Sequence, residues 1–308
     1  MPNLDPLASP ASSLRRPAAP AVVLLILVAA AITAVPGAAD EPAPSHTAAP
    51  HELLHATLWM QRSAEYRAIC LQTFQWGKAL VDQGLSDNSW HAALEEDTGP
   101  SDKPTAIIVD VDETLLDNSF YEARLVRDEQ EYSSKSWDPW VHEESAPALP
   151  GAVDFCRYVH EKGVTVFYLT NRKAHLTEAT RHNLAVRGFP MRPGVDPMLT
   201  RTDDKDKGAR RRSVAADYRV LLLVGDNVGD FASTFGESDI ALRAAKTDEY
   251  RALWGSRWLM LPNPAYGSWE GAILDGDYRV SRAQKLARKR AALLFDPVVG
   301  PDEPREHF

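Results

Sequence analysis

The chain has 308 residues, of which 44% are hydrophobic and 25% are charged, and its formal net charge is −9. This composition is typical of a globular protein, and the length suffices for one large domain with an insertion. The acidic balance argues against a nucleic-acid-binding protein, although small phosphorylated substrates need only local positive charge. The two cysteines, Cys70 and Cys156, are too few for a disulfide-rich scaffold; they can either pair or lie buried as small apolar side chains.

The first 39 residues have the order of regions of a cleavable signal peptide. An arginine pair precedes an uncharged run from Ala21 to Ala34, and small residues follow up to Ala39. The apolar run is shorter than the roughly 20 residues of a membrane-spanning helix. We therefore expect cleavage near Ala39 and a secreted or periplasmic protein without stable membrane insertion, and an uncleaved anchor is the alternative. With no cysteine near the cut, we expect no lipid anchor; the choice between Sec and twin-arginine export stays open.

The rest of the chain, residues 40–308, divides into segments of different composition and hydrophobic pattern. Its formal net charge is about −10, because the signal segment carries one acidic and two basic residues. Apolar residues recur at helical spacing between Leu53 and Leu80, and residues 281–294 form a basic amphipathic helix, surface-packed or, alternatively, membrane-associated. We expect five regions: a signal peptide (1–39), a flexible leader (40–50), N-terminal helices (51–104), a catalytic core (105–280), and a C-terminal helix and tail (281–308).

The core alternates short apolar runs with helical segments. The apolar runs are residues 106–109, 164–169 and 220–224, and the helical segments are residues 151–162, 175–187 and 205–217. Continuously apolar strands that alternate with helices predict a parallel sheet covered on both faces. The fold class is therefore α/β, with a Rossmann-like parallel sheet.

Each predicted strand ends in polar residues. The three clusters should meet at one edge, because ligands bind at the carboxyl ends of the strands of an open parallel sheet. Lys207 stands at the start of the helix that leads to the third strand. The clusters are Asp110-Val-Asp112-Glu-Thr114, Thr170-Asn171-Arg172 and Gly225-Asp226-Asn227-Val-Gly-Asp230.

These residue types allow a narrow range of chemistry. Asp110, Asp226 and a backbone carbonyl could hold Mg²⁺, which prefers oxygen ligands. With the ion and Lys207 neutralising a phosphoryl group, one carboxylate can attack phosphorus, and the carboxylate two residues on can transfer protons. Thr170 and Asn171 can donate hydrogen bonds to phosphoryl oxygens. Each residue alone could instead cap a turn or face solvent; their joint order along the chain favours a site.

The chain resembles a known group of enzymes at these positions. The three clusters and Lys207 are similar to the four motifs of the haloacid dehalogenase superfamily. Longer strings resemble the class C bacterial acid phosphatases, the four-aspartate family that includes the lipoprotein e type 5′-nucleotidases, over about residues 50 to 275. These strings are residues 112–119, 150–153, 167–173, 224–227 and 261–271.

The resemblance implies a role for each residue of the site. Asp110 would be the nucleophile and a Mg²⁺ ligand, and Asp112 would be the general acid and base, with its backbone carbonyl on the metal. Asp226 would complete the protein ligands, and Asp230 would support the water shell of the metal. Three further side chains would hold the phosphate: Thr170, Asn171 and Lys207.

The resemblance also implies a substrate platform and a cap. Trp137 and Tyr266 match the aromatic pair that sandwiches the ring of the substrate, and the insertion at about 116–149 would be a small helical cap, joined by the N-terminal helices. Two departures stand out. The chain lacks the cysteine that lipoprotein e members carry after the signal, and Gly229 stands where many members have aspartate.

We therefore expect a secreted Mg²⁺-dependent acid phosphatase. It would hydrolyse small phosphate monoesters, including nucleoside 5′-monophosphates, through an aspartyl-phosphate. The alternatives are a phosphotransferase on the same scaffold and a non-catalytic nucleotide-binding or storage protein. The preferred substrate, the pH optimum, the effect of Gly229 on metal affinity and the choice between monomer and homodimer are left open by the sequence.

Overall fold

The computed structural model describes residues 50–97, 99–236 and 239–295. The expected signal peptide, almost all of the leader, and the tail from residue 296 lie outside these residues. Along the described part of the chain, no helix combines the length and the hydrophobicity that a bilayer span requires.

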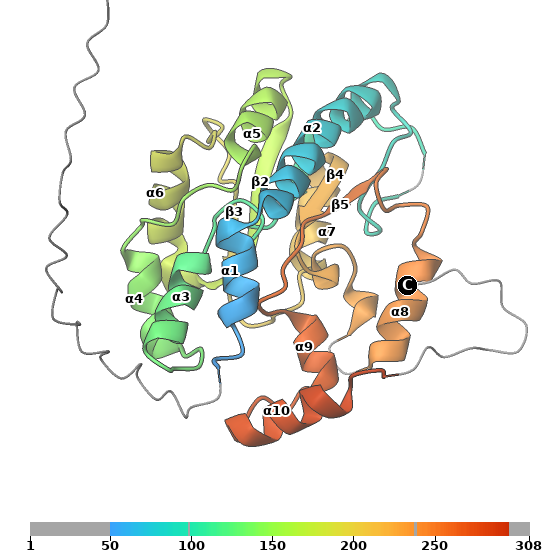
Figure 1. Cartoon of the computed structure of the whole chain (residues 1–308). Coiled ribbons are helices and arrows are strands. Elements are labelled where there is room, and N and C mark those ends of the chain that lie inside the picture. The colour runs from blue at the N-terminus through green and yellow to red at the C-terminus, as the bar shows by residue number, and fades with distance from the viewer. Residues whose placement is uncertain (1–49, 98, 237–238, 296–308) are drawn as a thin grey trace, which may run out of the picture. The chain divides into compact units, whose positions relative to one another are not determined.

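Five parallel strands form one sheet in the order β3-β2-β1-β4-β5 (Figure 1). The central strand β1 carries the predicted Asp110 at its carboxyl end, and its neighbours β2 and β4 carry the other two polar clusters. The predicted α/β fold with a parallel sheet is thereby confirmed. The strands are β1 (Thr105–Val109), β2 (Thr165–Lys173), β3 (Met198–Arg201), β4 (Arg219–Gly225) and β5 (Trp258–Met260).

The strand β1 is apolar from Ala106 to Val109 because both of its faces are buried there. Ile107 and Val109 belong to the hydrophobic cluster on one face, and Ala106 and Ile108 belong to the cluster on the other. Successive side chains of a strand point to opposite faces, so a strand covered on both sides has no polar position until it ends. The first polar residue, Asp110, therefore marks the edge of the core.

Helices cover both faces of the sheet. On the first face, α2 and α5 pack together, with the rings of Phe74 and Phe155 5.5 Å apart. Cys70 of α2 and Cys156 of α5 are buried free thiols there, in agreement with the second of the two alternatives for this pair. On the other face, α7 contributes Val214. These helices are α2 (Ala64–Ser86), α5 (Ala152–Glu161) and α7 (Gly208–Asp217).

The two ends of the insertion after β1 are joined by backbone hydrogen bonds where the insertion meets the core. The amide of Asp117 donates to the carbonyl of Pro147 at 2.8 Å, and the amide of Leu149 donates to the carbonyl of Leu115 at 2.9 Å. Between these points lie α3 (Ser119–Arg127) and α4 (Ser134–His142). The helix α1 (Leu54–Arg62) contacts α3, whereas α2 lies against the sheet.

The basic helix expected near the C-terminus is α10 (Arg282–Ala291), and it packs on the fold through ion pairs. Lys285 lies 3.0 Å from Glu131, and Lys289 lies 2.6 Å from Glu270. The basic face of α10 therefore meets acidic residues of the same chain. The remaining helices are α6 (Thr177–Arg187), α8 (Ile240–Glu249) and α9 (Ser268–Ile273), with short 3-10 turns at Ala174–Leu176, Val228–Asp230 and Ser233–Phe235.

Candidate active site

The register of the sheet brings the polar clusters to one edge. Val109 is aligned with Tyr168 of β2 and with Val224 of β4. The residues that follow on each strand are therefore level with one another. The amide of Asp110 also donates to the carbonyl of Val224 at 2.9 Å, which fixes the start of the loop after β1.

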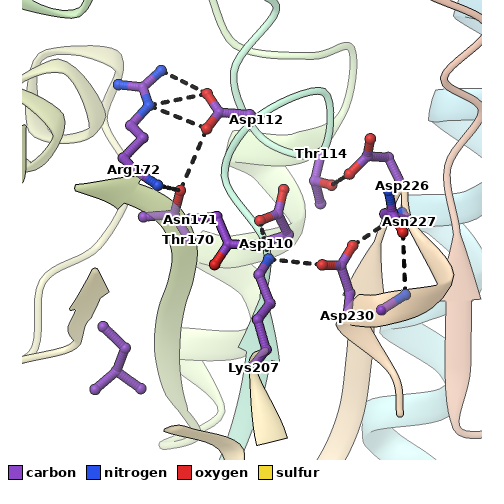
Figure 2. Close-up of polar contacts among 12 residues, drawn as sticks. Asp110, Asp112, Thr114, Thr170, Asn171, Arg172, Lys207, Asp226, Asn227 and Asp230 are labelled. Atoms are coloured by element: carbon purple, nitrogen blue, oxygen red, sulfur yellow. Dashed lines mark hydrogen bonds and ion pairs between the residues drawn. The ribbon is translucent and has the colours of Figure 1, made fainter. Parts of the chain in front are cut away.

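Lys207 joins two aspartates from different clusters. It directly precedes α7, and its ammonium donates a hydrogen bond to Asp110 Oδ1 and lies 2.7 Å from Asp230 Oδ1. Figure 2 shows the ammonium between the two carboxylates. Only 4% of Lys207 and 7% of Asp110 are exposed to solvent, so this contact is largely shielded from water.

Burial dominates the electrostatics of these groups. Burial raises the pKa of Asp110 to about 7 against the opposing effect of Lys207, and the Asp230 and Asp112 carboxylates raise it further. Burial and the nearby Asp110 and Asp230 raise the pKa of Asp226 well above its usual range. For Lys207, burial lowers the pKa, but the two carboxylates outweigh this effect and raise it, so the side chain stays charged.

The same carboxylates form a donor set that fits a divalent metal ion. One oxygen from each of Asp110, Asp226 and Asp230 lies within 4.8 Å of the others. Three carboxylates against one ammonium leave negative charge that is costly to bury without a further cation. Hard divalent ions bind oxygen ligands of this kind. Asp230, expected only to support the water shell of the metal, contributes an oxygen to the same set.

Hydrogen bonds from neighbouring residues orient Asp226 and Asp230. Thr114 Oγ1 donates to Asp226 Oδ1 at 3.4 Å, and Asn263 Nδ2 donates to Asp226 Oδ2 at 2.8 Å. The amide of Asn227 donates to Asp230 Oδ2 at 3.0 Å, which turns that carboxylate back over the end of β4. The cluster is thus held by residues from three separate segments.

Hydrogen bonds from Arg211 hold the turn that carries Asp230. The guanidinium of Arg211 donates to the carbonyls of Gly229 and Asp230 at 3.1 and 3.0 Å and to Glu95 Oε1 at 3.0 Å. Gly229 therefore supports the turn through its backbone. The departure from aspartate at this position does not disturb that contact.

Asp112 faces different partners from Asp110, although only Val111 separates them. Arg172 Nη2 donates to Asp112 Oδ1 at 2.7 Å, and Arg172 Nε donates to the same oxygen at 3.0 Å. Asn118 Nδ2 reaches this oxygen at 2.8 Å, and Thr170 Oγ1 donates to Asp112 Oδ2 at 3.3 Å. The two carboxylates are therefore held in different environments, one beside an ammonium and the other beside a guanidinium (Figure 2).

Thr170 and Asn171, expected to hold phosphate, lie at the end of β2. Thr170 is fully buried, and its Oγ1 accepts a hydrogen bond from the amide of Arg172 at 3.1 Å. Asn171 is exposed, and its Oδ1 accepts from Arg210 Nη2 at 2.7 Å. Arg210 also donates to the carbonyl of Thr170 at 2.7 Å, so it braces this strand end.

Each of the two aromatic residues expected to bind the substrate contacts a residue that is hydrogen-bonded to a site aspartate. Trp137 in α4 has the guanidinium carbon of Arg172 5.4 Å from its ring centroid. The backbone amide of Tyr266 donates at 3.2 Å to Asn263 Oδ1, whose amide group in turn binds Asp226. Both aromatics are half-buried.

Comparisons with known proteins agree with this arrangement. A model of the family described as HAD superfamily, subfamily IIIB (Acid phosphatase), matches residues 34–269. The chain belongs to this family. It is similar to the class C acid phosphatase of Bacillus anthracis, with a TM-score of 0.72 and 33% identity over 79% of this chain and 98% of that one.

Two further matches belong to the acid phosphatases. A structure of the Bacillus anthracis enzyme with tungstate bound gives a TM-score of 0.71, with the same identity and coverage. Acid phosphatase 1 of Solanum lycopersicum is 29% identical over 188 residues, and the match spans 59% of this chain and 66% of that relative. Family membership confirms the resemblance seen in the sequence and the expected class of enzyme, a hydrolase of phosphate monoesters.

Several site residues of this acid phosphatase family member have no role in the sequence-based prediction. Arg172 lies within a motif string, but the string does not show that its guanidinium faces Asp112. Asn118 and Asn263 lie in strings that match the family and carried no assigned function. Arg211 lies in a run of three arginines, and nothing in that run distinguishes the fully buried one.

Proposed function

We propose that this chain is a secreted Mg²⁺-dependent acid phosphatase that hydrolyses phosphate monoesters through an aspartyl-phosphate on Asp110. The supporting observation is the contact of buried Asp110 with Lys207, beside Asp226 and Asp230, while Asp112 is held separately by Arg172. One carboxylate thus lies where an anionic phosphoryl group would be neutralised. The other is placed to handle protons.

The reaction would take place in two displacements. In the first, a carboxylate oxygen of Asp110 bonds to phosphorus, the bond to the leaving oxygen breaks, and that oxygen takes a proton from the Asp112 carboxyl group. In the second, water attacks phosphorus and gives its proton to Asp112, and the bond between Asp110 and phosphorus breaks. Inorganic phosphate leaves and the enzyme returns to its starting state.

The phosphate would be held by Lys207, Thr170 and Asn171. The ammonium of Lys207 carries the positive charge, and the hydroxyl and amide add directed hydrogen bonds. When bound by Asp110, Asp226 and the backbone carbonyl of Asp112, with Asp230 supporting its water shell, Mg²⁺ would neutralise further charge on the phosphoryl oxygens. The tungstate in the Bacillus anthracis structure is a tetrahedral oxyanion of the shape expected for this site.

Nucleoside 5′-monophosphates are the substrates that we propose among small esters. Trp137 and Tyr266 would stack on the base, and each is connected to a residue that contacts a site aspartate. The cap is small, with two helices between residues 116 and 149, which favours a partly open site and several accepted esters. Adenosine 5′-monophosphate and glycerol phosphate, assayed with Trp137→Ala and Tyr266→Ala, test this point. Turnover of the nucleotide should fall far more than turnover of glycerol phosphate.

The central experiment is Mg²⁺-dependent release of phosphate from p-nitrophenyl phosphate by wild type and by Asp110→Asn. We expect turnover to require Mg²⁺ and to be lost in the variant, because an amide cannot form the covalent intermediate. A wild-type protein that binds nucleotide without turnover between pH 4 and pH 8 would instead be the non-catalytic binding protein. Preferential transfer of phosphate to an added alcohol would indicate the phosphotransferase.

Secretion is supported by the pattern of residues 1–39 alone. N-terminal sequencing of the exported protein tests it, and we expect the mature chain to begin at about residue 40. A mature protein that retains the arginine pair would contradict cleavage.

A further inference from the structure

Asn118 connects the cap to Asp112. Its side chain is fully buried at the start of α3. The Nδ2 group donates to Asp112 Oδ1 at 2.8 Å and to Glu113 Oε2 at 3.4 Å. The Oδ1 atom accepts from Trp140 Nε1 at 2.9 Å and from Arg172 Nη2 at 3.4 Å. The amide therefore uses both of its ends, one toward carboxylates and the other toward donors.

Trp140 makes the shorter of the two contacts that determine which end of the amide faces Asp112; Arg172 Nη2 makes the other. An indole N–H can only donate, so the atom of Asn118 that it meets must be the oxygen. The NH₂ group then points toward the carboxylates of Asp112 and Glu113, where it can donate. Without the indole donor, this oxygen would keep only the 3.4 Å contact with Arg172 Nη2, and the amide would be held less firmly in this orientation. The cap helix α4, which carries Trp140, thus fixes an orientation beside the reacting groups.

The result is an unequal Asp112 carboxyl group. Oδ1 accepts from Asn118 at 2.8 Å and from Arg172 at 2.7 and 3.0 Å, whereas Oδ2 has longer contacts of 3.3 Å with Thr170 and 3.2 Å with Arg172. Oδ1 is therefore saturated with donors. Oδ2 is the oxygen left to carry a proton to the leaving group.

We propose that Asn118 and Trp140 are positioning residues that aim Oδ2 of Asp112 at the leaving-group oxygen. This inference rests on the proposed function, because it concerns the proton that moves from Asp112 as the bond between phosphorus and the leaving oxygen breaks. Neither residue touches the substrate. Trp140 acts from the cap through its hydrogen bond to Asn118.

The test is Trp140→Phe, which removes the indole N–H and keeps an aromatic ring. Two esters with similar rings separate the effects: p-nitrophenyl phosphate, whose leaving group departs as a stable anion, and benzyl phosphate, whose alkoxide needs a proton. We expect kcat/KM for benzyl phosphate to fall about tenfold or more, and kcat/KM for p-nitrophenyl phosphate to change less than about twofold. The comparison uses kcat/KM because this ratio reports the steps up to departure of the leaving group. It excludes hydrolysis of the aspartyl-phosphate, in which Asp112 acts as the base for both esters.

Trp258→Phe is the matched control. Trp258 is also fully buried, and its Nε1 donates to a backbone carbonyl, that of Ala92, at 2.8 Å. We expect this variant to leave the ratio of the two rates unchanged. If Trp140→Phe lowers kcat/KM equally for both esters, or for neither, the positioning role is wrong.

Asn118→Ala provides a second test, which also applies if Trp140→Phe fails to fold. We expect the same selective loss with benzyl phosphate, and the double variant should be no slower than Asn118→Ala, because Trp140 acts through Asn118. Multiplied losses would overturn the proposal. The proposed function fails separately, if Asp110→Asn retains turnover.

Discussion

Gly225 and Asp230 lie so close together that position 225 has no room for a side chain. A Cβ atom built there would be 2.3 Å from Asp230 Oδ2 and 2.6 Å from Asp230 Cβ. The glycine at the end of β4 leaves room for the Asp230 carboxylate to lie over the strand end, where it reaches Lys207. The requirement comes from the site and not from the strand.

Gly225→Ala should weaken metal binding by moving Asp230 away from Asp110 and Asp226. We expect the affinity for Mg²⁺, measured by isothermal titration calorimetry, to fall about tenfold or more, as when groups that orient metal ligands are lost. Gly229→Ala is the control on the same turn, because a Cβ there would lie an ordinary 3.6 Å from its nearest neighbour, Asn227 Oδ1. Equal affinities in the two variants would contradict the role of the close contact.

Lys207→Met should make the folded state depend on added metal. The variant leaves the buried carboxylates of Asp110 and Asp230 without their ammonium partner, and breaking a buried ion pair in this way costs about 3 kcal/mol or more. Mg²⁺ at 100 times its Kd stabilises a folded protein by about 2.7 kcal/mol. Because the ion replaces part of the lost charge, it should stabilise this variant more than wild type.

Urea unfolding with and without MgCl₂ measures both effects of the Lys207 substitution. Lys205→Met, an exposed lysine two residues earlier, should behave as wild type. A Lys207→Met protein as stable as wild type without Mg²⁺ would show that the ammonium does not balance the cluster.

The central strands and the order of the main site residues could be predicted from the sequence. The strands β1, β2 and β4 are buried on both faces along most of their length, and this buried part of each strand is a largely apolar run. The edge strands β3 and β5 have four and three residues, which are too few for a periodic signal. Lys207 was expected at a helix start and directly precedes α7.

The partners of the site aspartates could not be predicted, because they depend on contacts between distant segments. Asn263 is 37 positions from Asp226, and Arg172 is 60 positions from Asp112. No local pattern shows which way such a side chain points. The resemblance implies different roles for Asp110 and Asp112, but the different cationic partners of the two carboxylates, Lys207 and Arg172, are visible only in the structure.

Glu122 should make wild-type stability fall as the pH rises toward neutrality. Burial, and to a lesser degree Glu270, raises the pKa of this carboxyl from 4.5 to about 7 in the folded protein. Between these values the folded state keeps a proton that the unfolded state has lost, so the free energy of unfolding decreases with pH. Glu122→Gln cannot ionise, and at pH 8 it should be more stable than wild type by about 3 kcal/mol.

The advantage of Glu122→Gln should disappear at pH 4, where both states of wild type are largely protonated. Denaturant unfolding at the two pH values measures the difference. Glu161→Gln, on the exposed side of α5, is the control and should show the same small change at both pH values. A Glu122→Gln advantage that is equal at pH 4 and pH 8 would mean that ionisation is not the cause.

Arg211→Lys should loosen the turn that carries Asp230. The guanidinium is fully buried and binds Glu95 through Nε and the carbonyls of Gly229 and Asp230 through Nη1. The compact ammonium of lysine donates from one nitrogen and does not match this planar arrangement. We expect the free energy of unfolding to fall by about 2 kcal/mol, and the affinity for Mg²⁺ to fall with it. Denaturant unfolding and calorimetric titration measure the two effects. Arg212→Lys, at the exposed next position of α7, should change neither, whereas unchanged Mg²⁺ affinity in a destabilised Arg211→Lys would confine Arg211 to a structural role.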